Sequence, residues 1–71
     1  MKRSMGYEMT GWRKGTRIRR RWGQGYISDG TVVSDGEYKT TSTSGLWYFN
    51  VHWGDGTSSR TVPLVNDEVL S

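Results

Sequence analysis

The 71-residue chain has no cysteine, a single proline and no long apolar stretch. Without cysteine, neither disulfide bonds nor a thiolate zinc site can hold the fold together. No apolar run approaches the length of a membrane span, and the first ten residues lack the apolar region of a signal peptide. We therefore expect one domain with no metal or cofactor and no membrane contact. The expected location is intracellular, and the sequence does not distinguish cytoplasm from nucleoid or nucleus.

Aliphatic side chains are scarce, so aromatic residues must supply much of the core. The chain contains four tryptophans, four tyrosines and one phenylalanine, and each buried ring removes a large apolar area from water. Ten glycines are spread along the chain, and no segment has apolar residues at helical spacing over three turns. These features predict a small all-β domain without a long helix.

Charge is distributed unevenly between the two parts of the chain. Residues 1–21 contain eight lysines and arginines and one glutamate, whereas residues 22–71 contain two basic and six acidic residues. Such asymmetry indicates either an anionic partner or self-association of oppositely charged surfaces.

Alternation and turn residues divide the chain into short strands. We expect a flexible basic arm over residues 1–11 and a domain over residues 12–71, with Trp12 folding back over one end. Strands are predicted over residues 16–22, 30–34, 46–53, 57–62 and 68–70, with a core at Val32 or Val33 in the second of them. Residues 34–45 are predicted to form a long variable loop, and residues 64–66 a 3₁₀ turn. Five strands with one such turn before the last are typical of an SH3-like barrel.

The first predicted strand carries the densest basic run. Alternation places Arg17, Arg19 and Arg21 on its outer face, and Ile18, Arg20 and Trp22 on its inner face. We expect Arg20 to bury its stem near an open end of the barrel and keep its charged group in water. In residues 46–53, the inner face is predicted to hold Trp47, Phe49, Val51 and Trp53, and the outer face Leu46, Tyr48, Asn50 and His52.

No catalytic constellation is present. The single histidine, His52, is expected on the surface of a strand. Asp29 and Asp55 each precede a glycine, which predicts turn positions for both. No nucleophile motif or phosphate-binding glycine loop occurs, so we expect a protein that is not an enzyme.

The segments GTRIRRRW, DGTVVS, YFNVHWGDGTSSRTVPL and NDEVL resemble a Tudor-type SH3-like domain over about residues 15–70. The resemblance implies a five-stranded barrel. KOW, chromo-barrel and agenet domains and the plasmid-type dihydrofolate reductase share this outline. The substrate-binding V-Q-I-Y run of that reductase has no counterpart here, because residues 59–62 are SRTV.

Tudor-type domains bind methylated lysine or arginine in an aromatic cage, or bind nucleic acid on a basic face. Trp22 and Trp53 match two cage positions. Another position falls near Ser28, with Tyr26 two residues before it, and the last falls near Ser59, which is not aromatic. The resemblance therefore implies a partial cage in which cation–π attraction would hold a cation.

Three hypotheses for a non-enzymatic binding module follow. The first is contact with nucleic acid through Arg13, Lys14, Arg17, Arg19 and Arg21. The second is recognition of a protein segment, such as one with a methylated lysine or arginine, at a cleft of Trp22, Tyr26 and Trp53. The third is a structural subunit that self-associates or joins a larger phage or mobile-element assembly. The plainer alternatives are a solvated strand face that prevents edge aggregation and aromatic rings that serve only as core.

Overall fold

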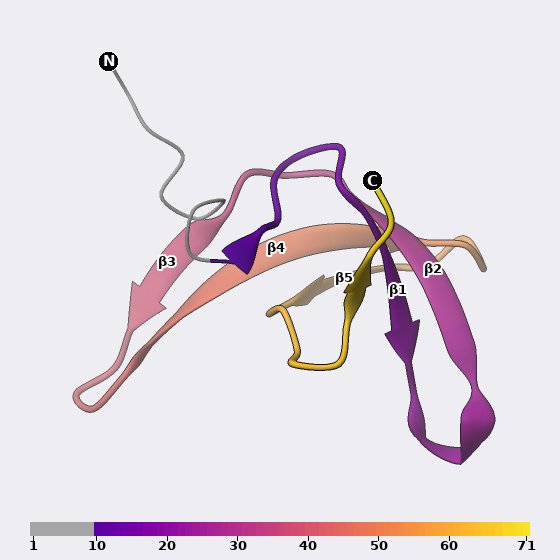
Figure 1. Ribbon diagram of the computed structural model, residues 1–71. Coiled ribbons are helices and arrows are strands. Elements are labelled where there is room, and N and C mark those ends of the chain that lie inside the picture. Colours follow the sequence, from indigo (N-terminus) through magenta and orange to yellow (C-terminus); the bar gives the residue numbers. More distant parts are fainter. Residues whose placement is uncertain (1–9) are drawn as a thin grey trace.

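A computed structural model describes residues 10–71 and shows an antiparallel sheet of six strands (Figure 1). The all-β prediction is therefore confirmed. The strands are β1 (Arg17–Arg21), β2 (Ile27–Val32), β3 (Glu37–Thr40), β4 (Gly45–Trp53), β5 (Ser58–Thr61) and β6 (Glu68–Val69), and a 3₁₀ turn, η1 (Gly23–Gly25), joins β1 to β2. Within these residues, no helix is both long and apolar enough to cross a bilayer.

The long strand β4 organises the sheet. Residues 51–53 of β4 pair with β2, and residues 45–48 pair with β3. The amide of Val33 donates to the carbonyl of Asn50 at 2.9 Å, so β2 and β3 follow one another along the same edge of β4. The opposite edge of β4 pairs with β5. Beyond β2 lie β1 and then β6.

The core lies on the inner face of this curved sheet. Ile18, Val32, Phe49 and Val51 are almost completely buried there, together with Trp53. Their positions follow from alternation along β1, β2 and β4, which sends every second side chain inward. The predicted inner and outer faces of β1 and β4 are confirmed. The exception is Trp22, which was predicted on the inner face but lies just beyond β1 and is partly exposed.

Trp12 completes the core from outside the sheet. Its side chain is 1% exposed, and its ring meets Phe49 edge-on with centroids 5.4 Å apart. This confirms that Trp12 folds back over the domain. The predicted arm over residues 1–11 lies almost entirely outside the described residues.

Gly30 is required where β2 crosses the core. A Cβ atom at this position would lie 2.7 Å from side-chain atoms of both Trp53 and Val51. Ordinary contacts between carbon atoms are about 3.5–4.0 Å, so the two side chains occupy the space that a larger residue would need. The absence of a side chain at Gly30 therefore lets β4 pack its core residues against β2.

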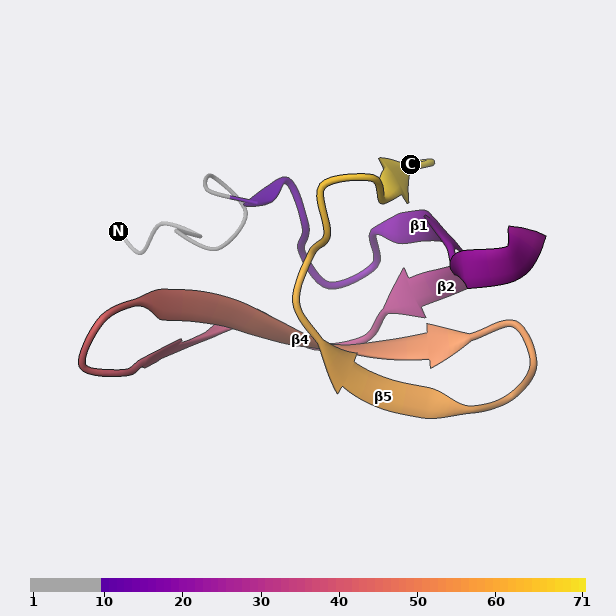
Figure 2. The same ribbon diagram turned by 90° about the horizontal axis from the view of Figure 1, so that it is seen from below.

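The expected five-stranded barrel is not formed. The described residues form an open sheet, in which no ladder joins β5 to β6 or β1. The reason is that β6 contains only two residues and pairs with β1 alone. Figure 2 shows the consequence: the β4–β5 hairpin curls beneath β1 and β2 but leaves the sheet unclosed.

Three local predictions also need correction. The second strand begins at Ile27, earlier than predicted, because residues 23–25 alone make the turn; Gln24 and Gly25 there adopt positive φ angles of 64° and 82°. Residues 34–45 do not form one long loop, since β3 lies within them. Residues 64–66 form no 3₁₀ turn; the amide of Asp67 bonds instead to the carbonyl of Leu64 in a simple turn. A 3₁₀ turn occurs at η1 instead.

Candidate nucleic-acid interface

The strand β1 presents three arginines on its outer face. Arg17 and Arg21 are exposed and Arg19 is half-buried, as alternation predicted. Their neighbours determine how much positive charge is available to a ligand, because a guanidinium already bonded to a carboxylate must exchange it for a phosphate.

Arg19 is paired with Asp29 directly across the β1–β2 ladder. Its Nε and Nη2 donate to the two carboxylate oxygens at 2.8 and 3.1 Å, which is a bidentate arrangement. These bonds hold the pKa of Asp29 below its ordinary value, and they raise the pKa of Arg19. Asp29 was predicted to be a turn residue. It lies inside β2 instead, where it neutralises part of the basic face.

Arg21 has a weaker partner. Its Nη2 lies 3.6 Å from Glu68 Oε1 on β6, and both side chains are about half exposed. Arg17 differs from both, because no carboxylate of residues 10–71 lies within 4 Å of its guanidinium. Arg17 is therefore the arginine of β1 that can bind an anion without first releasing an internal partner.

Arg17 begins a row of polar side chains across the outer face. Its partner in β2 is Thr31, which in turn faces His52 in β4, and His52 faces Ser58 in β5. The imidazole Nδ1 of His52 lies 3.1 Å from the Ser58 hydroxyl. His52 is exposed on a strand, as predicted. We call these four residues the polar row.

A hollow of about 210 Å³ lies beside the polar row. Arg17, Thr31 and His52 line it, with Asp29 and the 54–56 turn closing one end. Asp55 holds that turn, since one of its carboxylate oxygens accepts from the amide and the hydroxyl of Thr57. These bonds lower the pKa of Asp55 and confirm its predicted turn role. The hollow has room for a phosphate group, with the cation of Arg17 at its side.

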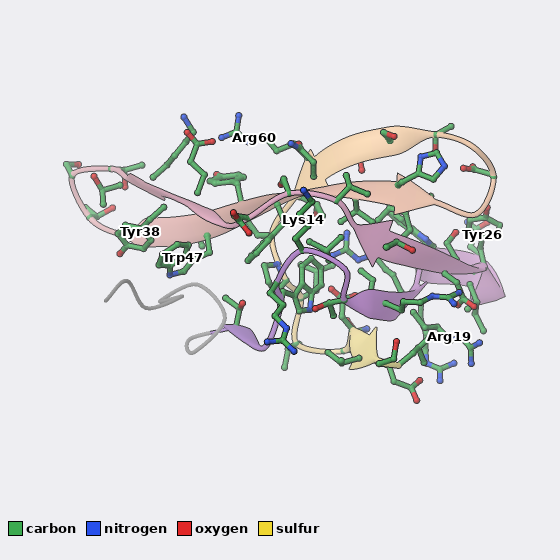
Figure 3. The ribbon with its side chains drawn as sticks, turned by 90° about the horizontal axis from the view of Figure 1, so that it is seen from above. Lys14, Arg19, Tyr26, Tyr38, Trp47 and Arg60 are labelled. Carbon is green, nitrogen blue, oxygen red and sulfur yellow. The ribbon has the colours of Figure 1, made fainter. Side chains whose placement is uncertain are left out.

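The remaining predicted basic residues lie before β1. Arg13 and Lys14 are exposed in a turn, where the amide of Thr16 bonds to the carbonyl of Arg13 at 2.9 Å. Figure 3 shows Lys14 well apart from Arg19. The five predicted basic residues therefore do not converge on one point, and they are spread over β1 and the turn that precedes it.

The predicted aromatic cleft is only partly assembled. Trp22 and Trp53 meet edge-on with centroids 5.7 Å apart. The amide of Trp22 bonds to the carbonyl of Tyr26 at 2.7 Å, but among the described residues the Tyr26 ring contacts neither tryptophan ring. Trp53 itself is buried, and its indole Nε1 donates to the Ser59 hydroxyl at 2.8 Å.

A cation of the chain itself already lies beside these two rings. The guanidinium carbon of Arg20 is 5.5 Å from the ring centroid of Trp22 and 5.4 Å from that of Trp53. Within about 6 Å a cation is attracted to an aromatic face. The position that a methylated side chain would take in this pair is therefore filled by Arg20.

The charged group of Arg20 is buried, which corrects the prediction that it reaches water. The residue is 3% exposed, and its Nε and Nη2 donate to the Asp67 carboxylate at 2.9 and 2.7 Å. The guanidinium also donates to the hydroxyl of Thr61 and the carbonyl of Val62. Sequence reasoning missed Asp67 because 47 residues separate it from Arg20. The pair links β1 to the segment after β5, where the sheet is open.

Apolar side chains gather elsewhere. A groove of about 370 Å³ lies between residues 45–47 and residues 62–65, and Leu46, Leu64 and Val65 are exposed along it. Within the described residues, no group of three or more His, Asp or Glu side chains could hold a metal ion. No protein-family model, curated protein or solved structure matches this chain.

Proposed function

We propose that this protein is a non-enzymatic module that binds the backbone phosphates of nucleic acid with the outer face of β1, β2 and β4. The observation that carries the proposal is the hollow beside the polar row, where Arg17 is exposed and has no carboxylate partner among residues 10–71. The hydroxyl of Thr31 and the hydrogen-bonded pair of His52 and Ser58 add donors, which are common partners of phosphate oxygens.

Binding through such a face is weak and sensitive to salt. Arg17 and Lys14 supply the cations, whereas Arg19 and Arg21 contribute only after leaving Asp29 and Glu68. Phosphate contacts carry no sequence information, so different sequences bind alike. The alternative of a methyl-lysine or methyl-arginine site is less favoured, since Arg20 lies beside both Trp22 and Trp53.

The proposed fold relationship remains a Tudor-type, SH3-like one. In support, β1, β2, β4 and β5 follow one another across the sheet in chain order, and the last strand, β6, returns beside β1. The β3 segment is then an insertion between the second and third strands of an SH3-like sheet that is not closed into a barrel.

Arginine-to-glutamine variants and one aspartate variant test the proposed face. We expect Arg17→Gln to weaken binding to a short DNA duplex and to reduce the slope of log affinity against log salt by about 0.9, the value for one phosphate contact. Asp29→Asn should do the opposite, because it frees the guanidinium of Arg19 for phosphate. Arg21→Gln is the matched control on the same strand, with a smaller effect than Arg17→Gln. Fluorescence anisotropy at several salt concentrations measures all four proteins.

Two results would reject the proposal. One is an affinity of the unmodified protein that does not change between low and physiological salt. The other is equal binding by the unmodified protein, Arg17→Gln and Asp29→Asn.

A further inference from the structure

The β3 strand has one edge without a partner in the described part of the chain. β3 pairs only with β4, and all four of its residues are exposed. Figures 1 and 2 show the β3–β4 hairpin projecting away from β1, β2 and β5, with β3 on its outer side. An unpaired strand edge presents backbone donors and acceptors that can pair with another strand.

The hydrogen-bond pattern of the hairpin shows which groups of β3 face outward. The amide of Thr41 bonds to the carbonyl of Ser44 at 2.7 Å, which makes these two residues a hydrogen-bonded pair. Bonded and non-bonded pairs alternate along an antiparallel ladder. Tyr38 and Trp47, three positions along, are therefore a non-bonded pair. The N–H and C=O groups of Tyr38 consequently point to the free edge.

The sequence of β3 is complementary to itself when two copies run antiparallel. If Tyr38 stands opposite the same residue of the second copy, their outward N–H and C=O groups can exchange two hydrogen bonds. Glu37 of each copy then stands opposite Lys39 of the other. Opposite charges facing one another across a ladder are favourable, and so are paired aromatic rings. Such a contact has the two-fold symmetry common among protein dimers.

The side chains needed for this contact are placed on suitable faces. Glu37 and Lys39 share one face, where their charged groups lie 3.6 Å apart and are more than half exposed. Glu37 also pairs with Arg60 of β5. Tyr38 lies on the other face, where its ring packs against Trp47 with centroids 5.0 Å apart, as Figure 3 shows. Pairing two copies would set two such ring pairs side by side.

We propose that the protein forms a dimer in which the β3 strands of two copies pair antiparallel about Tyr38. The paired edge is only four residues long, so the contact falls at the low end of protein interfaces, below about 1,200 Å². The dimer is accordingly weak and depends on protein concentration. It uses a different surface from the polar row, so it does not depend on the proposed nucleic-acid function.

Charge reversal at β3 tests the pairing. Lys39→Glu places two glutamates of one copy opposite two of the other, and Glu37→Lys does the same with lysines. Each variant alone should dimerise about tenfold more weakly than the unmodified protein, because like charges directly opposite are unfavourable. Mixed in equal amounts, the two variants should form a heterodimer as readily as the unmodified protein, since every glutamate then faces a lysine.

Sedimentation equilibrium over a range of protein concentrations measures the dimer, and circular dichroism checks that each variant is folded. Three results would overturn the proposal. The first is an unmodified protein that remains monomeric at millimolar concentration. The second is dimerisation of the single variants as strong as that of the unmodified protein. The third is a mixture of the two variants that dimerises no better than either variant alone. If both variants dimerise as strongly as the unmodified protein, the contact between copies lies on another surface.

Discussion

At the scale of single residues, the buried pair of Arg20 and Asp67 matters most for the fold. The two side chains are 4% and 2% exposed, and the same carboxylate of Asp67 also accepts a hydrogen bond from the amide of Leu64. Taking two charges out of water is costly, and it is offset here by hydrogen bonds that satisfy nearly every donor of the guanidinium. The pair thereby links β1 to the chain after β5 without any backbone ladder.

Breaking this pair should destabilise the protein strongly. Asp67→Asn leaves the cation of Arg20 buried without its counter-charge, which costs about 3 kcal/mol or more in the free energy of unfolding. A 71-residue domain has only about 4–10 kcal/mol in total. Glu68→Gln is the matched control, because its partner Arg21 is exposed and surface pairs contribute about 1 kcal/mol or less. Urea denaturation measures both variants, and similar losses would contradict the account of Arg20.

Single residues also show where sequence reasoning succeeds and fails. Alternation correctly gave the side of the strand for Arg17, Arg19 and Arg21. It could not find the partners Asp29 and Asp67, because a carboxylate ten or 47 residues away is brought close only by the register of the sheet and the path after β5. The charge available at each arginine therefore could not be read from the run of basic residues.

At the scale of elements, β4 is the strand that the sequence predicts best. Residues 49–53 alternate strictly between buried and exposed side chains, and such a pattern favours a strand with one face toward the core. β3 was missed because its residues are polar and exposed on all sides. Its pairing with β4 depends on the backbone and the ring contact of Tyr38 with Trp47, neither of which produces an apolar alternation.

A pair of substitutions in β4 tests its register. Val51 is completely buried, whereas Leu46 on the opposite face is 48% exposed. Val51→Ala should lower the free energy of unfolding by about 2 kcal/mol, through lost apolar contact and an unfilled space. Leu46→Ala should cost clearly less, since about half of its side chain remains in water. A loss below about 0.5 kcal/mol for Val51→Ala would mean that a different set of residues faces the core.

At the scale of the whole molecule, the fold carries three candidate surfaces, two of which adjoin because Trp53 also lines the hollow beside the polar row. The polar row lies on the outer face, the ring pair of Trp22 and Trp53 lies with Arg20, and the free edge of β3 lies on the projecting hairpin. The all-β class could be predicted from glycine content and alternation. The open sheet could not be predicted, because it depends on the short length of β6. It also depends on Arg20, whose side chain connects β1 to the chain after β5 where no ladder forms.

One measurement tests the proposed function most directly. Chemical shifts of the backbone amides, followed by NMR while a short DNA duplex is added at low salt, report which surface is contacted. We predict that the largest changes occur at Arg17, Thr31, His52 and Ser58, and that they diminish at physiological salt because phosphate contacts are screened. Changes confined to Trp22 and Tyr26, or none at all, would contradict the account.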